Sequence, residues 1–175
     1  MSELQLETPR LFLRLMHLSD LDDLLKIFAD PKVMASFDSA AFNREQMEHW
    51  LQRNIEHQNL HGYGLFSVML KSEDILIGDC GLELMEVEGD LANELGYDFR
   101  SDYWNQGFAT EAASAVRNYA FNILHLPSLI SLIRVGNKAS KRVAEKIGMR
   151  YTAKITQNGI HYWKYAIDGS SNTNQ

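Results

Sequence analysis

Residues 103–112 constrain the possible fold of this chain most, because an aromatic loop with a single glycine runs directly into a helix-forming stretch. The first backbone N–H groups of a helix have no partner inside the helix, and the helix dipole places partial positive charge at that end. Gly107 lets the backbone approach a ligand closely. Residues 94–99 read as a strand, so a strand, a loop and a helix follow one another in the order that is typical of a phosphate-binding site.

The loop contains no lysine or arginine, so backbone amides and the helix dipole must provide most of any phosphate recognition. It also lacks the Gly-Lys-Ser/Thr ending of a P-loop, which excludes a nucleoside-triphosphate site of that class. The formal net charge of -6 argues against general nucleic-acid binding and suits a cationic substrate.

At 175 residues the chain is long enough for one compact domain with a real core, which we expect over residues 1–168. The polar residues 169–175 are expected to form a disordered tail. No apolar run approaches the roughly 20 residues that span a bilayer, and the acidic, polar opening is no signal peptide. We therefore expect a cytoplasmic protein with no membrane partner. Cys80 lies in an apolar run, which favours a buried thiol over a catalytic nucleophile.

Two helices are predicted in the first third of the chain. Ser19 is expected to cap the first helix, whose apolar face lies within residues 21–28 and which Pro31 ends. Asn43, with Gln46 three residues later, resembles a capping box, and apolar residues then recur at helical spacing.

The rest of the chain alternates strands with helices. Helical spacing from Thr110 and the Ile- and Leu-rich run that follows predict a strand, a helix and a strand joined as a parallel crossover. A helix over residues 138–147 is expected to end at Gly148. The class is therefore mixed α/β. The predicted strands cover residues 11–16, 64–70, 75–84, 91–99, 129–135 and 160–167, the second and third forming an antiparallel hairpin.

Several short motifs occur in an order and spacing that is specific for one superfamily. They are Thr8-Pro9-Arg10-Leu11-Phe12-Leu13-Arg14, Ile77-Gly78-Asp79-Cys80-Gly81-Leu82, residues 103–112, Asn137-Lys138-Ala139-Ser140 and Glu145-Lys146-Ile147-Gly148-Met149. In these residues the chain resembles the GNAT acyltransferase superfamily, and within it the branch that includes the ribosomal-protein N-terminal alanine acetyltransferases. The resemblance covers almost the whole chain without specifying a substrate.

The resemblance implies a GNAT fold, whose mixed, mostly antiparallel central sheet splays open between residues 94–99 and 129–135 to hold acetyl-CoA as co-substrate. The pantetheine arm is expected to bond the backbone of the first strand, and the pyrophosphate to rest on amides of the loop. Relatives commonly have glycine where this chain has Asn105, but asparagine tolerates the left-handed backbone that keeps its amide pointing inward. The implied cofactor-binding residues are Tyr97, Asp98, Phe99, Trp104, Asn105, Gln106, Gly107, Phe108, Ala109, Thr110, Asn137, Ser140 and Arg142.

Asn137 and Ser140 lie near the start of one predicted helix. As N-cap, Asn137 can satisfy an orphan amide, and that role alone explains an asparagine there. In the resembled enzymes the matching asparagine binds the pantetheine arm, and the matching serine lies near the sulfur, where it can pass a proton to the leaving thiolate. Lys138, Lys141 and Arg142 either meet the CoA phosphates or are exposed helix charges.

Acetyl transfer requires that an amine lose its proton, that the oxyanion be stabilised and that the thiolate gain a proton. Glu94 is the candidate base, acting directly or through a water; the alternative is a solvated or ion-paired carboxylate. A backbone N–H near Tyr97 or Asp98 is the candidate oxyanion donor. At pH 7, deprotonation costs roughly 1 kcal/mol for an α-amine of pKa about 7.7–8.0 and roughly 4–5 kcal/mol for a lysine amine of pKa about 10.4.

We therefore expect an acetyl-CoA-dependent N-acetyltransferase, and the resemblance favours a protein or peptide α-amine as acceptor. One alternative is a small-molecule amine, such as a polyamine, an amino acid or an antibiotic. Another is a non-catalytic CoA-binding regulatory module. The six histidines show no metal-ligand spacing, so no metal is predicted. The oligomeric state, monomer or homodimer, stays open.

Overall fold

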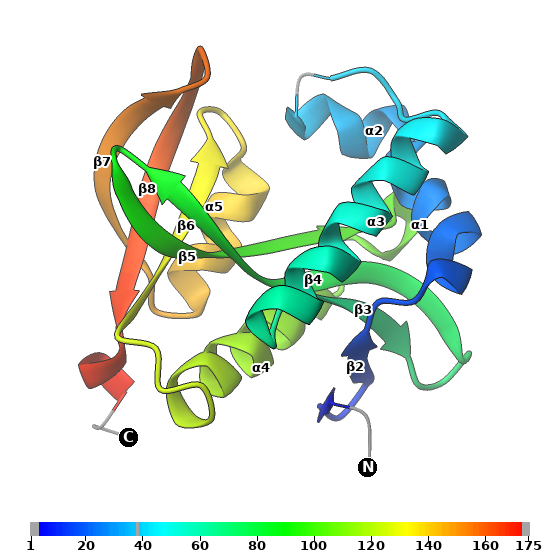
Figure 1. The fold of residues 1–175 in the computed structure, drawn as a ribbon, viewed down its shortest axis with the longest axis horizontal. Helices are drawn as coiled ribbons and strands as arrows, with labels where there is room; N and C mark the ends of the chain where they lie inside the picture. Colours follow the sequence, from blue (N-terminus) through cyan, green and yellow to red (C-terminus); the bar gives the residue numbers. More distant parts are fainter. Residues whose placement is uncertain (1–3, 38, 173–175) are drawn as a thin grey trace.

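An eight-stranded sheet forms the centre of the computed structural model, which describes residues 4–37 and 39–172 (Figure 1). The strand order is β1-β2-β3-β4-β5-β6-β8-β7, and every neighbouring pair is antiparallel except β5 and β6. The predicted mixed, mostly antiparallel sheet is confirmed. The strands are β1 (Gln5–Glu7), β2 (Leu11–Leu15), β3 (Leu65–Leu70), β4 (Ile75–Val87), β5 (Asp90–Phe99), β6 (Ser128–Arg134), β7 (Arg150–Gln157) and β8 (Ile160–Asp168).

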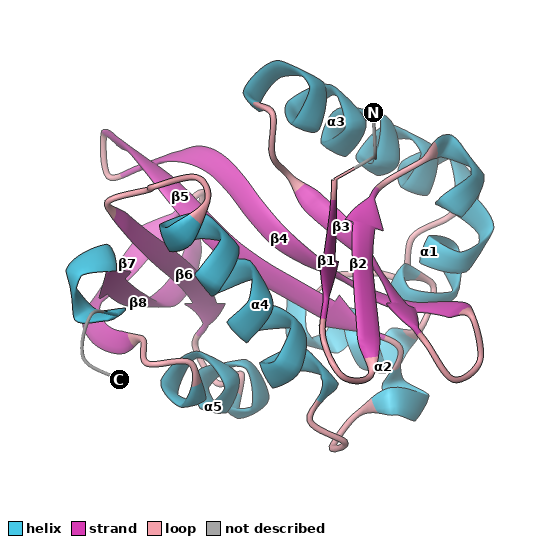
Figure 2. Ribbon diagram, turned by 90° about the horizontal axis from the view of Figure 1, so that it is seen from below, coloured by secondary structure: helices cyan, strands magenta, loops and turns pink. Residues whose placement is uncertain are grey.

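Helices cover both faces of the sheet (Figure 2). They are α1 (Leu21–Phe28), α2 (Pro31–Met34), α3 (Arg44–His61), α4 (Phe108–Asn122) and α5 (Lys138–Lys146). α4 and α5 pack on one face, in a core that includes Val116 and, as predicted, the buried thiol of Cys80. α1, α2 and α3 pack on the other face around Leu24 and Met47. Within the described chain, no helix combines the length and apolarity needed to cross a membrane.

The capping-box prediction for α3 is confirmed. Asn43 Oδ1 accepts a hydrogen bond from the Gln46 backbone N–H, and Gln46 Oε1 accepts one from the Asn43 N–H, each at 2.9 Å. Two N-terminal amides of the helix region thus find partners without help from tertiary structure, which is why the pattern is readable in the sequence.

Ser19 does not cap α1, contrary to the expectation. It lies in a 3-10 turn, Leu18–Asp20, that leads into the helix, and Asp20 takes the N-cap position. The Asp20 carboxylate bonds Arg14 at 2.6 and 2.9 Å and accepts a 2.7 Å bond from the Ser67 hydroxyl. This network ties β2, β3 and α1 together, so a tertiary interaction decides how the helix begins.

Pro31 begins a helix, whereas the sequence predicts only that it ends one. α1 stops at Phe28, and Pro31 occupies the first position of α2, where a missing N–H costs nothing. Asp30 caps α2 by accepting a 2.9 Å bond from the Lys32 N–H. The sequence pattern predicts neither α2 nor the 3-10 turn at Ala35–Phe37 that follows it.

β5 and β6 part soon after they meet. Their parallel register contains one residue pair, Glu94 with Ile130, whereas β4 accompanies β5 along its whole length. The Ser131 hydroxyl donates a 2.6 Å bond to the Leu95 carbonyl in place of a ladder bond. Beyond this point the β6-facing backbone of β5 has no strand partner among the described residues, which confirms the predicted opening in the sheet.

The C-terminal part differs from the prediction in two places. β7 is missing from the predicted strands, because this edge strand is mostly exposed and polar and buries only Ile155. Gly169–Asn172, expected to be disordered, form a 3-10 turn in which the Gly169 N–H donates a 2.9 Å bond to the Pro127 carbonyl. Residues 173–175 of the predicted tail lie outside the described residues.

Candidate active site

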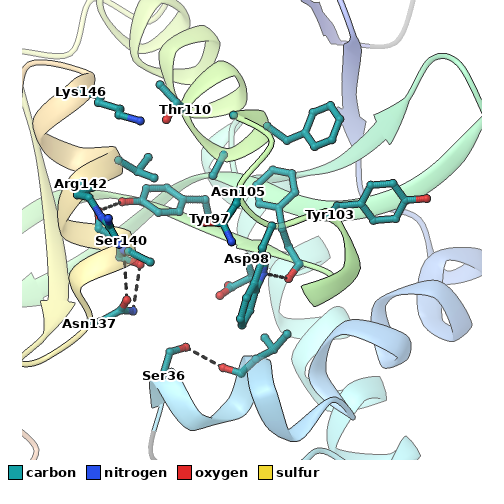
Figure 3. A pocket seen from close by; sticks show the side chains of 18 residues that line it. Ser36, Tyr97, Asp98, Tyr103, Asn105, Thr110, Asn137, Ser140, Arg142 and Lys146 are labelled. Carbon is teal, nitrogen blue, oxygen red and sulfur yellow. Dashed lines mark hydrogen bonds between the residues drawn. The ribbon is translucent and has the colours of Figure 1, made fainter.

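A cleft of about 390 Å³ opens where β5 and β6 part (Figure 3). The end of β5, the loop and first turn of α4, and one side of α5 line it. Gln106 and Glu94, two of the predicted site residues, do not line the cleft. The predicted residues that line it are Tyr97, Asp98, Phe99, Trp104, Asn105, Gly107, Phe108, Ala109, Thr110, Asn137, Ser140 and Arg142.

The loop before α4, residues 104–107, turns on two residues with left-handed backbone. Asn105 has φ of 60°, as predicted for this position, and Gly107 has φ of 83°. Gly107 is the N-cap of α4 and has no side chain with which to bond the first amides of the helix. Those amides are left available to a ligand at the positive end of the helix dipole. The loop therefore has the geometry of an anion-binding site at a helix N-terminus.

Asn137 caps α5 and also lines the cleft, so its two predicted roles are compatible. Its Oδ1 accepts a 3.1 Å bond from the Ser140 N–H, and its Nδ2 donates a 3.1 Å bond to Ser140 Oγ. Because Ser140 Oγ is the acceptor in that contact, the hydroxyl hydrogen remains available, and no described residue accepts it. The Ser140 hydroxyl can therefore donate a hydrogen bond to a molecule in the cleft.

Tyr97 reaches from β5 to α5 beside the cleft. Its hydroxyl donates a 2.7 Å bond to the Ser140 carbonyl (Figure 3). Burial, with Cys80 and nearby carboxylates, raises the pKa of Tyr97 far above its usual value. The phenol is therefore neutral, and its hydrogen is already engaged in the bond to the Ser140 carbonyl.

Arg142 and Lys146 bring positive charge to the cleft from α5. Lys141 points elsewhere: its Nζ lies 3.8 Å from the Glu145 carboxylate and 5.6 Å from the centre of the Trp163 ring. Of the three helix cations proposed from the sequence, Arg142 alone lines the cleft, with Lys146 one turn later.

Glu94 lies in the middle of β5, not at its start as expected. Its Oε1 accepts a 3.3 Å bond from the Leu132 N–H of β6, and its Oε2 lies over Gly96, 3.3 Å from where a Cβ there would be. Burial raises the pKa of Glu94 to about 7; the Leu132 bond opposes the shift and neighbouring Glu83 adds to it. A carboxylate with this pKa can both take and release a proton near neutral pH.

Asp79 of β4 and Asp98 of β5 lie opposite each other in the strand register, and both are carboxylates. Asp79 is 1% exposed, and neither of its oxygens has a hydrogen-bond partner in the described structure. Burial raises the pKa of Asp98 to about 7, and burial together with Asp98 raises the pKa of Asp79 well above its usual value. Like charges at this spacing disfavour ionisation of both groups.

Some residues of the cleft are not predicted from the sequence as cofactor-binding or catalytic residues. On α5 the helical spacing from Ser140 could have indicated Val143 and Lys146, because helix positions three or four apart share a face. The short helix α2 and the turn after it carry no such signal, since they reach the cleft only through tertiary packing. The other lining residues are Val33, Ser36, Ala139, Val143 and Lys146, together with Tyr103, which opens the motif at residues 103–112.

The residues present fit acetyl-CoA in two respects. The α4 amides, Arg142 and Lys146 offer donors and charge for phosphate oxygens. The backbone of β5 at Tyr97, which β6 does not pair, offers partners for the amides of a pantetheine arm, whereas the Phe99 carbonyl already accepts a 2.9 Å bond from Trp104 Nε1. Over the described ranges, no three His, Cys, Asp or Glu side chains are grouped to hold a metal ion.

Comparison with known proteins identifies the class. Residues 10–150 match the acetyltransferase (GNAT) domain. The Bacillus subtilis protein YkkB is 36% identical over 152 residues, covering 86% of this chain and 88% of its own. The crystal structure of a GNAT-family acetyltransferase from Bacillus anthracis is 27% identical with a TM-score of 0.80, covering 95% of this chain and 99% of that one. This chain belongs to the GNAT acetyltransferase family, which confirms the predicted family.

Two more distant structures share the fold. RimL, a ribosomal alpha-N-protein acetyltransferase in complex with coenzyme A, is 18% identical with a TM-score of 0.77, covering 94% of this chain and 98% of that one. The aminoglycoside acetyltransferase AAC(6')-Ib, also with coenzyme A, is 14% identical with a TM-score of 0.78, again covering 94% and 98%. Proteins named for peptide and for small-molecule acceptors thus share this fold, so the fold does not specify the acceptor.

Proposed function

We propose that this protein moves the acetyl group of acetyl-CoA to a primary amine, and that its preferred acceptor is a peptide or protein N-terminal α-amine. The observation that carries the proposal is the cleft between β5 and α5, where the α4 amides, the unpaired β5 backbone and the Ser140 hydroxyl meet. Family membership supports acetyl-CoA as the donor. A cytoplasmic location fits a chain whose single cysteine, Cys80, is a buried thiol.

In this proposal Glu94, which does not line the cleft, takes the proton of the amine through a water above Gly96, or directly from an amine that approaches over Gly96. The Glu94 pKa of about 7 is roughly one unit below that of an α-amine and more than three units below that of a lysine or polyamine nitrogen. Each unit costs about 1.4 kcal/mol, so proton transfer favours the α-amine by about 3 kcal/mol. The buried surroundings of the Glu94 carboxylate therefore support an acceptor amine of low pKa, which needs only a weak base.

The neutral nitrogen then attacks the thioester carbonyl, so an N–C bond forms and the C–S bond breaks. A backbone N–H near Tyr97 or Asp98 stabilises the oxyanion. Ser140 gives its hydroxyl proton to the departing sulfur and regains one from solvent, while Asn137 holds the oxygen in place. The proton from the amine leaves through Glu94.

A small polyamine is the second candidate acceptor, and the acidic face of β4 and β5 supports it. The strand register places Glu83 opposite Glu94 and Asp79 opposite Asp98, all on one face of the sheet. As pH rises above about 7, where Glu94 and Asp98 ionise, the carboxylates on this face increasingly attract a molecule with more than one positive charge. The formal net charge of -6 acts in the same direction.

Thiol release from acetyl-CoA with three acceptors tests the proposal. They are a peptide with a free α-amine, the same peptide N-terminally blocked and carrying one lysine, and spermidine. We expect the highest kcat/KM with the free α-amine, and mass spectrometry of the product to place the acetyl group there. Faster turnover of spermidine would support the second candidate instead. Coenzyme A binding without thiol release from any acceptor would contradict both and leave the regulatory module.

A further inference from the structure

Arg10 contacts the start of α4, although it comes from the turn between β1 and β2. Its Nη1 donates a 2.8 Å bond to the Gln106 carbonyl, 96 residues away in sequence. Its Nε donates a 2.7 Å bond to Glu111 Oε2, and its guanidinium lies 4.2 Å over the Phe108 ring. A Cβ on residue 107 would lie 3.3 Å from Arg10 Nη2, so the glycine at that position also makes room for the arginine.

Glu111 holds Arg10 in this position. Its carboxylate accepts a 2.6 Å bond from the Thr8 hydroxyl and a 2.9 Å bond from the Arg10 backbone N–H, besides the bond from Arg10 Nε. The Glu111 side chain is 17% exposed and that of Arg10 is 44% exposed. Because the two charges are paired, Arg10 adds little free positive charge to the loop. Any role of Arg10 there must come from the way its hydrogen bond orients the loop backbone.

The Gln106–Gly107 peptide unit supplies that geometry. The C=O and the N–H of a trans peptide point in opposite directions from one rigid plane, and the described chain contains no cis peptide. Arg10 does not line the cleft, whereas Gly107 does. When Arg10 holds the Gln106 carbonyl on its own side of the loop, the Gly107 N–H is turned to the other side, toward the cleft.

We propose that Arg10 is a positioning residue for the CoA pyrophosphate: its guanidinium fixes the Gln106–Gly107 peptide so that the Gly107 amide faces the phosphate. The inference rests on the proposed function, since it concerns the same cofactor site. It gives the motif at residues 8–14 a part in cofactor binding, which the loop's own sequence does not reveal. It also explains how a loop without lysine or arginine keeps its amides in place.

Arg10→Met, Arg10→Lys and a control, Arg53→Met on the exposed side of α3, test the proposal. Methionine keeps an apolar side chain of similar length and removes the guanidinium, with its hydrogen-bond donors and its contact with the Phe108 ring. We expect the Kd of CoA to rise about tenfold or more in Arg10→Met, as the loss of charge-assisted hydrogen bonds allows. Turnover of acetyl-pantetheine, which has no pyrophosphate, should stay within about twofold of the parent. Lysine cannot make both planar contacts, so Arg10→Lys should resemble Arg10→Met.

Equal losses with CoA and acetyl-pantetheine would show a general structural defect and overturn the proposal. An unchanged CoA affinity, or full recovery in Arg10→Lys, would overturn it as well. Should Arg10→Met fail to fold, as judged by its thermal transition, the comparison of CoA with acetyl-pantetheine is made on Arg10→Lys. A parent protein that does not bind CoA would instead contradict the proposed function, so the two failures are distinguishable.

Discussion

The Tyr97 hydroxyl donates a 2.7 Å hydrogen bond to the Ser140 carbonyl and thereby joins β5 to the first turn of α5 where no ladder bond does. The bond spans the opening in the sheet. It fixes the distance between the strand that is expected to receive the pantetheine arm and the helix that carries the candidate acid.

Tyr97→Phe should therefore widen or loosen the cleft. We expect KM for acetyl-CoA to rise about three- to tenfold, the effect of about one hydrogen bond, with a smaller change in kcat. Tyr165→Phe is a matched control, because Tyr165 also donates a hydrogen bond to α5, at 3.2 Å to Glu145, but does not line the cleft. Equal effects of the two substitutions on KM would contradict a role for the Tyr97 bond in the cleft.

Ser140→Ala tests the proton donor. The variant should keep its CoA affinity and lose turnover by about 10²-fold, most with thioesters whose thiol has a high pKa, because a poorer leaving group depends more on the proton. Steady-state rates over a series of acetyl thioesters measure this dependence. A loss that is the same for every thiol would remove Ser140 from this role and leave water as the donor.

Asn105→Gly tests the account of the loop. Asn105 adopts φ of 60°, which glycine reaches without strain. The glycine variant should bind CoA as tightly as the parent, within about threefold, if the backbone alone matters. Calorimetric titration with CoA measures the affinity. A loss much larger than this would mean that the Asn105 side chain itself makes a needed contact.

Asp79→Asn should stabilise the protein in alkaline solution. The folded-state pKa of Asp79 is raised by burial and by Asp98, so ionisation destabilises the fold as pH rises above the unfolded value of about 3.9. Asparagine is neutral throughout. The Tm of the variant should exceed that of the parent at pH 8, by about 2–4 °C for each kcal/mol gained, and the difference should vanish near pH 4. A variant that is less stable at pH 8 would show that the ionised carboxylate is stabilised in the fold.

The fold was largely predictable from local patterns, since the capping box of α3, the antiparallel hairpin and the strand-loop-helix segment are each encoded within a few residues. The exceptions have tertiary causes. Asp20 begins α1 because Arg14 and Ser67 hold its carboxylate, and β7 forms because β8 offers it an edge.

The candidate site was predictable where the residues follow one another along the loop and α5. The site was less predictable where residues from different helices, strands and loops come together. Lys146 lines the cleft instead of Lys141 because of how α5 is rotated, and Arg10 reaches Gln106 across 96 residues. No local pattern contains that contact. Glu94 was chosen by its residue type, yet its pKa is raised by burial that only the folded sheet provides, and the hydrogen bond from Leu132 opposes that shift.

The pH dependence of kcat for the parent and for Glu94→Gln, with one α-amine peptide at saturating acetyl-CoA, tests the central claim most directly. The base must be ionised to act, so the parent should lose activity as pH falls through about 7, the pKa of Glu94. Glutamine preserves the Leu132 contact, and it should lower kcat by about 10²- to 10⁴-fold and abolish this dependence. The dependence near pH 8 that belongs to the peptide's own amine should remain in both proteins. A glutamine variant with the parent's rate and the parent's profile would contradict the account.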